Sequence, residues 1–201
     1  MGTMFRSAIM NDIIAKHPMD GVRYTKPVRA VDDIHFLTRE EQAIFLETAK
    51  RSHNYRQYVL LLETGLRTSE LIGLTWDSID WKKHALTINK TLEYRHKNKC
   101  WRAGPPKTEK SYRTIPLTDR AYAVLKSCYD ERDSRKESDT LSQVLEYIDR
   151  RTGRTGTLVM KDLVFINYRT GEPAKNSSYD THLYKLCDEA GIEHFCMHAL
   201  R

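Results

Sequence analysis

The spacing of hydrophobic residues changes sharply between residues 74 and 86. Upstream, apolar side chains recur at helical intervals in residues 38–50, 55–63 and 68–74. From Leu86 to Tyr94, apolar and polar residues alternate, which is the period of a half-exposed strand. The change predicts that a group of helices is followed by a small β-sheet.

Two more strands complete the predicted sheet. SYRTI at 111–115 is stopped by a proline, and LVFIN at 163–167 is a short apolar run. Further helices are predicted from residue 119, around 141–148 and over 177–190, the last ending at Gly191. We therefore predict a mainly α fold with a small three-stranded antiparallel β-sheet, of the α+β class.

Two helix boundaries carry specific signals. Thr38 is followed three residues later by Glu41, as a capping box requires. Gly65 directly follows the apolar run YVLLLET and is a natural helix C-cap. At the N-terminus, residues 5–17 predict a short helix, and residues 18–36, with Pro18, Gly21 and Pro27, predict a linker or a segment lying over the surface.

The positive charge of the chain is concentrated in one stretch. The formal net charge is +6, yet residues 82–113 alone carry ten Lys or Arg against Glu93 and Glu109. Such a block fits a phosphate backbone, or it is a solvated basic loop. Three aromatic residues within it, Tyr94, Trp101 and Tyr112, argue against a disordered tail.

The remaining composition excludes several classes. Hydrophobic residues make up 40% of the chain, enough for a core, and no window approaches the ~20 apolar residues of a membrane span. No signal peptide is recognisable at the N-terminus. The four cysteines are scattered without a C-x-x-C pair, which disfavours a metal site or a disulfide framework and favours the cytoplasm.

Three stretches carry candidate chemistry. In ETGLRTSELIGL, Arg67 follows a capping glycine and has Glu70 three residues on; the pair either ties two helices together or holds the guanidinium rigid for a phosphate. Lys107 follows Gly-Pro-Pro and precedes a strand, at or near the tip of a hairpin. Taken by itself, it would be read as an ordinary surface lysine. His198 and Arg201 share one helical face in HALR, which is a weak motif alone.

Taken together, the stretches resemble the tyrosine recombinase (phage integrase) family. TGLRTSELIGLTWDSID is similar to its first arginine box, KTEKSYRTIPL to its β-hairpin lysine box, and HALR to its H-x-L-R box. The resemblance is strongest to integrases of conjugative transposons. It implies a catalytic domain over 37–201, a linker over 25–36 and the end of a preceding core-binding domain over 1–24.

The resemblance also implies roles for single residues. Arg67 and Arg201 would clamp the scissile phosphate, Lys107 would protonate the leaving 5′-oxygen, and His198 would assist proton transfer. Glu70 would orient the first arginine. Lys90, Arg102, Lys110 and Arg113 would bind DNA. The family needs neither a metal nor ATP, because a phosphotyrosine linkage conserves the bond energy.

The sequence departs from the family after Arg201, where the family continues with a helix, a second histidine or tryptophan, and the nucleophile. A tyrosine nucleophile is expected after the H-x-L-R box, and none of the eleven tyrosines follows it. Tyr179 and Tyr184 precede the box and are predicted to be core or helix-surface residues. We expect the sequence to be a piece lacking its C-terminal end, inactive alone and monomeric, of a protein that acts as a tetramer on double-stranded DNA at its attachment sites.

Two other hypotheses stay open at this level. The chain could be a non-catalytic DNA-binding protein derived from a recombinase. It could also be an unrelated helical protein whose basic hairpin contacts other proteins.

The lysine box generates a test in the full-length protein. Lys107→Ala should leave DNA binding nearly intact and slow strand cleavage by about 100-fold or more, the scale for loss of a general acid. A substrate with a 5′-thiol leaving group, which needs no protonation, should restore the rate. If the thiol substrate is cut as slowly as the ordinary one, Lys107 is not the acid.

Overall fold

The structure, a computed structural model, describes residues 2–22, 37–106, 111–134, 144–167 and 170–200. The chain divides into two compact units, residues 1–34 and 35–201. The first contains α1 (Gly2–Met10), which is shorter than the helix predicted over 5–17. It ends early because Asn11 donates its side-chain amide to the Ser7 carbonyl and Asp12 turns to a φ of 54°.

The helices of the second unit begin and end largely where the sequence predicts. Thr38 and Glu41 form the predicted capping box, and Gly65 and Gly191 take the left-handed conformation of C-caps, with φ of 61° and 67°. None of the described helices is long and apolar enough to span a bilayer. The helices are α2 (Arg39–Ala49), α3 (Tyr55–Thr64), α4 (Thr68–Ile72), α5 (Asp119–Ser134) and α6 (Asn176–Ala190).

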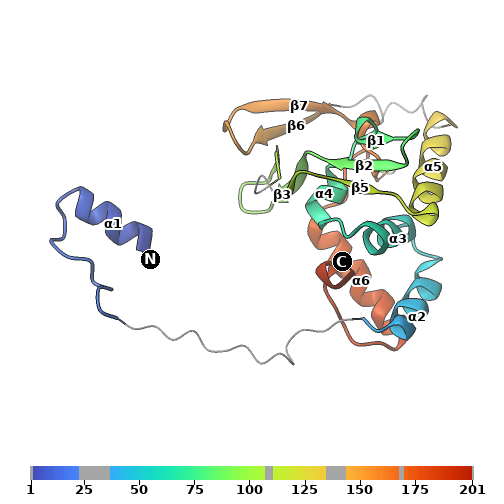
Figure 1. Cartoon of the computed structure of the whole chain (residues 1–201), viewed down its shortest axis with the longest axis horizontal. Coiled ribbons are helices and arrows are strands. Elements are labelled where there is room, and N and C mark those ends of the chain that lie inside the picture. Colours follow the sequence, from blue (N-terminus) through green and yellow to red (C-terminus); the bar gives the residue numbers. More distant parts are fainter. Residues whose placement is uncertain (1, 23–36, 107–110, 135–143, 168–169, 201) are drawn as a thin grey trace. The chain divides into compact units, whose positions relative to one another are not determined.

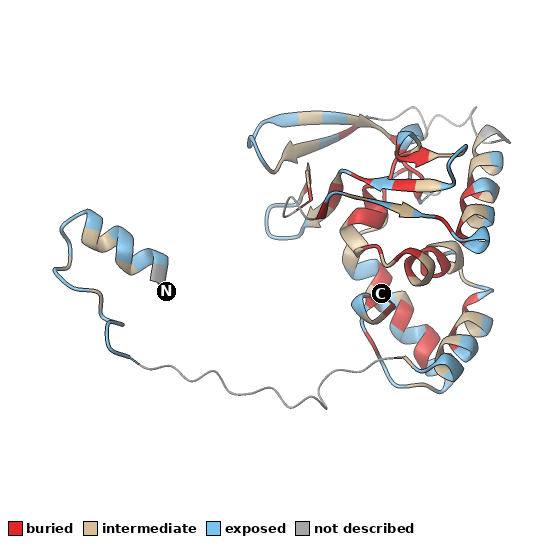
Figure 2. Ribbon diagram, in the orientation of Figure 1, coloured by how far each residue is buried: buried red, intermediate tan, exposed pale blue. Residues whose placement is uncertain are grey.

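Helix α3 lies at the centre of this unit. Its residues Tyr58, Val59, Leu60 and Leu61 are fully buried, because α2, α4 and α5 all pack against it. Figure 2 shows α3 as one of the most completely buried helices, whereas α2 and α5 expose one side. A helix that is apolar on several faces is stable only in such a setting.

Three aromatic rings join α2, α3 and the segment after α6. Phe45 meets the ring of Tyr58 at a centroid distance of 5.3 Å and that of Phe195 at 5.2 Å, both edge to face. Edge-to-face pairs add about 0.5–1.5 kcal/mol each beyond their buried area. Phe195 thereby fixes the chain just before the short 3-10 helix η6 (Met197–Leu200).

The strands form two sheets instead of one (Figure 1). The first has the order β1-β2-β5 and is wholly antiparallel, which confirms the predicted small antiparallel sheet and the fold class. The second has the order β3-β4-β6-β7, with β4 and β6 parallel. The strands are β1 (Ile79–Asp80), β2 (Ala85–Ile88), β3 (Thr91–Arg95), β4 (Cys100–Gly104), β5 (Arg113–Pro116), β6 (Val144–Asp149) and β7 (Thr155–Val159).

The single strand predicted over 86–94 is wrong in one respect, because it is divided at Lys90. Its two halves, β2 and β3, belong to different sheets. The Lys90 ammonium group turns away to donate to Thr75 Oγ1 at 2.6 Å and to Asp77 Oδ1 at 3.2 Å, next to the 3-10 helix η2 (Trp76–Ser78).

The helix predicted around 141–148 is also wrong. Residues 141–143 lie outside the described part, and from Val144 the chain is strand β6, paired with both β4 and β7. The apolar spacing there suits either structure, and tertiary pairing decides between them.

The strand predicted over 163–167 is also wrong. LVFIN makes only two isolated bridges, Thr75 with Leu163 and Asn167 with Glu172, and it follows the 3-10 helix η5 (Met160–Asp162). The third strand of the first sheet is β1 instead.

Gly73, at the end of α4, lets this helix approach β3 closely. A Cβ atom at this position would lie 2.7 Å from the backbone nitrogen of Leu92 and 3.0 Å from the carbonyl carbon of Thr91. Backbone atoms cannot move aside cheaply. Gly73 therefore sets the distance between the helix that carries Glu70 and the second sheet.

We predict that Gly73→Ala lowers the free energy of unfolding by about 1–3 kcal/mol, the range for overpacking. Gly73→Val should cost more. Chemical denaturation measures both, with Lys126→Ala on the exposed face of α5 as a control expected within about 0.5 kcal/mol of the unsubstituted chain. A Gly73→Ala chain as stable as the control would mean that α4 and β3 separate easily.

Candidate functional site

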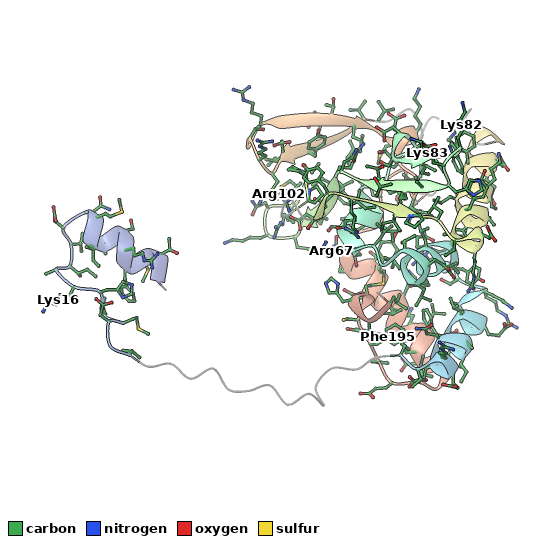
Figure 3. The ribbon with its side chains drawn as sticks, in the orientation of Figure 1. Lys16, Arg67, Lys82, Lys83, Arg102 and Phe195 are labelled. Atoms are coloured by element: carbon green, nitrogen blue, oxygen red, sulfur yellow. The ribbon has the colours of Figure 1, made fainter. Side chains whose placement is uncertain are left out.

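Arg67 occupies the N-cap position of α4. Its backbone is extended, with φ −78° and ψ 152°, between the left-handed Gly65 and the first turn of the helix. Its side chain is 39% exposed, whereas Leu66 beside it is buried. The guanidinium is thus held at the surface by a backbone that the core fixes on both sides (Figure 3).

Glu70 is the buried partner of two arginines. Its side chain is 1% exposed, and its carboxylate accepts from the Arg67 backbone N–H and from Arg67 Nη1, each at 2.9 Å. Arg113, at the start of β5, donates to the same carboxylate from Nη1 at 3.1 Å and from Nη2 at 2.9 Å. We call Arg67, Glu70 and Arg113 the shared-carboxylate cluster.

The hydrogen bonds of the shared-carboxylate cluster outweigh the cost of burial. Burial by itself would raise the pKa of Glu70, but the bonds from Arg113 and then from Arg67 lower it below its usual value. The carboxylate is therefore ionised at neutral pH, and the two guanidinium groups with the one carboxylate give the cluster a net charge of +1.

His198 lies on η6, which packs against α3 and α6. Met197 and Leu200 are buried on either side of it, while His198 itself is exposed. The elements that carry Arg67 and His198 are therefore supported by the same helix, α3. η6, dark red in Figure 1, lies next to α6.

Three predicted site residues, Lys107, Lys110 and Arg201, lie outside the described residues. The structure does describe what flanks the lysine box. β4 ends at Gly104, where the Arg150 N–H donates to the Ala103 carbonyl at 2.6 Å and the Arg150 guanidinium bonds the Pro105 carbonyl. On the other side Ser111 is buried.

The basic stretch of the sequence does not form one surface. Lys82 and Lys83 lie in the turn between β1 and β2, and Figure 3 shows them near α5 and well apart from Arg67. Lys90 and Arg113 both bind acidic side chains of the chain itself. Arg102, on β4, is partly exposed, and its buried Nε has no hydrogen-bond partner among the described residues.

Sequence reasoning missed two features. The ion pair between Arg113 and Glu70 joins residues 43 positions apart, and no local spacing signals it. The turn between β6 and β7 places Arg150, Arg151 and Arg154 beside the end of β4, the strand that leads to the lysine box. The RRTGR sequence signals this turn, but only the parallel pairing of β4 with β6 shows where it lies.

Tyr179 lies in the core and Tyr184 on a helix surface, as the sequence predicts. Tyr179 is 1% exposed in the core, where burial raises the pKa of its hydroxyl far above the usual value. Tyr184 stacks on His194 at a centroid distance of 4.9 Å on the surface of α6. In the described part of the chain, no three His, Cys, Asp or Glu side chains are grouped to hold a metal ion.

Comparisons with known proteins agree on one family. The model of the phage integrase family matches residues 35–201. The transposase from transposon Tn916 of Enterococcus faecalis is 32% identical over 155 residues, which cover 73% of this chain and 37% of that protein. A XerC-like tyrosine recombinase of Caldanaerobacter subterraneus subsp. tengcongensis is 25% identical over 210 residues, covering 99% of this chain and 50% of that protein.

Solved structures show the same fold. The Tn1549 transposon integrase in complex with transposon right end DNA has a TM-score of 0.71 at 21% identity, over 99% of this chain and 60% of that one. A lambda integrase dimer bound to a COC′ core site has a TM-score of 0.56 at 17% identity, over 100% of this chain and 58% of that one. The chain thus spans at most about half the length of the curated relatives named above.

The shared-carboxylate cluster generates a stability prediction. Because the pKa of Glu70 is lower in the folded chain than its ordinary value of 4.5, the stability that the ionised carboxylate contributes is fully present above that pH and is lost as pH falls through the folded pKa. Glu70→Gln should cost about 3 kcal/mol at pH 7, the scale for breaking a buried ion pair. The difference from the unsubstituted chain should shrink as the pH falls below about 4.5.

Denaturant unfolding between pH 3 and 7 measures this difference. Glu47→Gln is the matched control, since Glu47 pairs with Lys50 at i+3 but is 72% exposed. It should cost less than about 0.5 kcal/mol. Equal effects of the two substitutions would contradict the buried role of Glu70.

Proposed function

The chain belongs to the phage integrase family of tyrosine recombinases, whose model matches residues 35–201, and we propose that it is part of a site-specific integrase of a mobile element. Such an enzyme cuts and rejoins DNA strands through a 3′-phosphotyrosine intermediate. The observation that carries the proposal is the shared-carboxylate cluster, which holds Arg67 at the surface with net positive charge.

The proposed division of the chain follows the family. Residues 37–201 belong to the catalytic domain, residues 25–36 form a linker, and residues 1–24 end a preceding core-binding domain. The compact unit that begins at residue 35, and the family match that begins at the same residue, support this division.

Arg67 and Arg201 are proposed to bind the non-bridging oxygens of the scissile phosphate. Charge builds on these oxygens in the pentacoordinate transition state, and donors already held in place stabilise it without reorganising. Lys107 is proposed as the general acid and His198 as the residue that assists proton transfer with the attacking tyrosine. The exposure of His198 on an anchored turn supports its role.

Double-stranded DNA is the proposed partner. Arg102 and Lys110 are proposed to contact its backbone, and Lys90 stays a weaker candidate because its ammonium group is bound to Thr75 and Asp77. The λ integrase and Tn1549 integrase structures contain DNA, which supports this partner. We further propose a homotetramer on DNA for the full-length protein, a monomer for this chain alone, and the cytoplasm as its location.

Salt-titrated binding tests the DNA contact. The chain should bind duplex DNA with an affinity that falls steeply with salt, and Arg102→Gln should reduce the slope of log K against log salt by about 0.9, the contribution of one phosphate. Lys126→Gln, on the exposed face of α5, should leave the slope unchanged. If the chain does not bind DNA, or binds it equally well at all salt concentrations, the hypothesis of an unrelated protein whose basic hairpin contacts other proteins is favoured.

Covalent trapping tests the chemistry. The full product of the reading frame is incubated with a duplex nicked beside the cleavage site, so that the cut strand diffuses away and the adduct accumulates. We expect a protein–DNA adduct that Arg67→Lys reduces by about 100-fold, because lysine lacks the fork that grips two oxygens. Salt-sensitive binding without any adduct would instead indicate a DNA-binding protein derived from a recombinase.

A further inference from the structure

The guanidinium group of Arg113 is bound to other residues of the chain. Both of its Nη atoms donate to the Glu70 carboxylate, one to each oxygen. Nη1 also donates to the Ser111 carbonyl at 3.3 Å, and the side chain is 26% exposed. A bidentate guanidinium–carboxylate pair of this kind is among the strongest and most directional contacts of proteins.

The bidentate pair limits what Arg67 gives to the same carboxylate. Arg67 donates one side-chain hydrogen bond to Glu70, from Nη1, and its guanidinium makes no other hydrogen bond in the part of the chain that the structure describes. Among the described residues, its Nε and Nη2 make no hydrogen bond, and the side chain is 39% exposed. Glu70 thus orients Arg67 but occupies only one of its side-chain donor groups.

Charge leads to the same conclusion. If Glu70 were paired with Arg67 alone, its negative charge would cancel the positive charge of Arg67 as felt by a nearby phosphate. Solvent and salt screen the charge of a buried group only weakly, so this cancellation would be nearly complete. Arg113 offsets the charge of Glu70, so the positive charge of Arg67 stays available. A burial of Glu70 as deep as 1% exposure would also disfavour its ionised form if Arg113 were absent.

We propose that Arg113 is a positioning residue: it holds the Glu70 carboxylate so that Arg67 keeps its orientation, its donors and its positive charge for a DNA phosphate. This inference rests on the proposed function and replaces a direct DNA contact by Arg113. Removing Arg113 should therefore act through Arg67 and Glu70.

A double-mutant cycle on duplex DNA binding tests the proposal. Arg67→Gln and Arg113→Gln should each weaken binding by about 10-fold, the scale of one charge-assisted hydrogen bond. The double variant should lose no more than about 2-fold beyond the weaker single variant, because Arg113 has nothing to position once Arg67 is gone. A loss near 100-fold, the product of the two, would mean that Arg113 contacts its own phosphate and would overturn the proposal.

Arg102→Gln provides the comparison for additivity. Arg102 lies on β4 and makes no contact with Glu70 among the described hydrogen bonds, so its effect should multiply with that of Arg67→Gln. Arg113→Lys should recover part of the affinity, since lysine restores the charge without the fork. Thermal unfolding confirms that each variant is folded before binding is measured. If Arg113→Gln does not fold, Arg113→Lys takes its place in the double-mutant cycle.

A second readout does not depend on DNA. The carbon NMR signal of the Glu70 carboxyl should titrate at a higher pH in Arg113→Gln than in the unsubstituted chain, and Arg113→Lys should shift it less. An unmoved titration overturns the proposal. If the titration moves but the unsubstituted chain binds no DNA, the proposed function fails and with it the role of Arg113 toward a phosphate, leaving Arg113 as a structural partner of Glu70.

Discussion

The buried carboxylate of Glu70 joins two parts of the chain that are far apart in the sequence and meet at the candidate site. Its oxygens bind the backbone and side chain of Arg67 at the start of α4 and the side chain of Arg113 at the start of β5. A buried acid without such partners would be too costly to keep ionised. Helix α4, strand β5 and the surface arginine Arg67 are therefore held in one arrangement by one group, and α3 packs against α4.

The sequence predicts those features that depend on local chemistry. The capping box at Thr38, the left-handed glycines Gly65 and Gly191 and the length of α3 all follow from residues within one or two turns. The association of Arg67 with Glu70 is predictable for the same reason, because the residues are three apart at one helix end. The family was predicted from three short boxes, and the family model over residues 35–201 confirms it.

Features that depend on distant pairing could not be predicted. The apolar residues of β6 fit a helix as well as a strand, and only its pairing with β4 and β7 decides. Lys90 looked like a basic residue for DNA, yet Asp77 and Thr75 lie within reach of it in space. In the sequence, Arg113 is equivalent to the other basic residues of the stretch, and only the fold places it next to Glu70. Lys107, Lys110 and Arg201 lie outside the described residues, so their roles remain predictions.

The contact of Phe195 with Phe45 has a consequence for the motions of the chain. Moving η6 away from α3 would separate these rings and expose Met197 and Leu200, both buried. Each such side chain contributes about 1.5–3 kcal/mol when buried, so a local opening that displaces His198 would cost several kcal/mol. The histidine is therefore held by the same cooperative unit as the core. The backbone amides of η6 should therefore exchange with solvent slowly, on the timescale on which that unit opens.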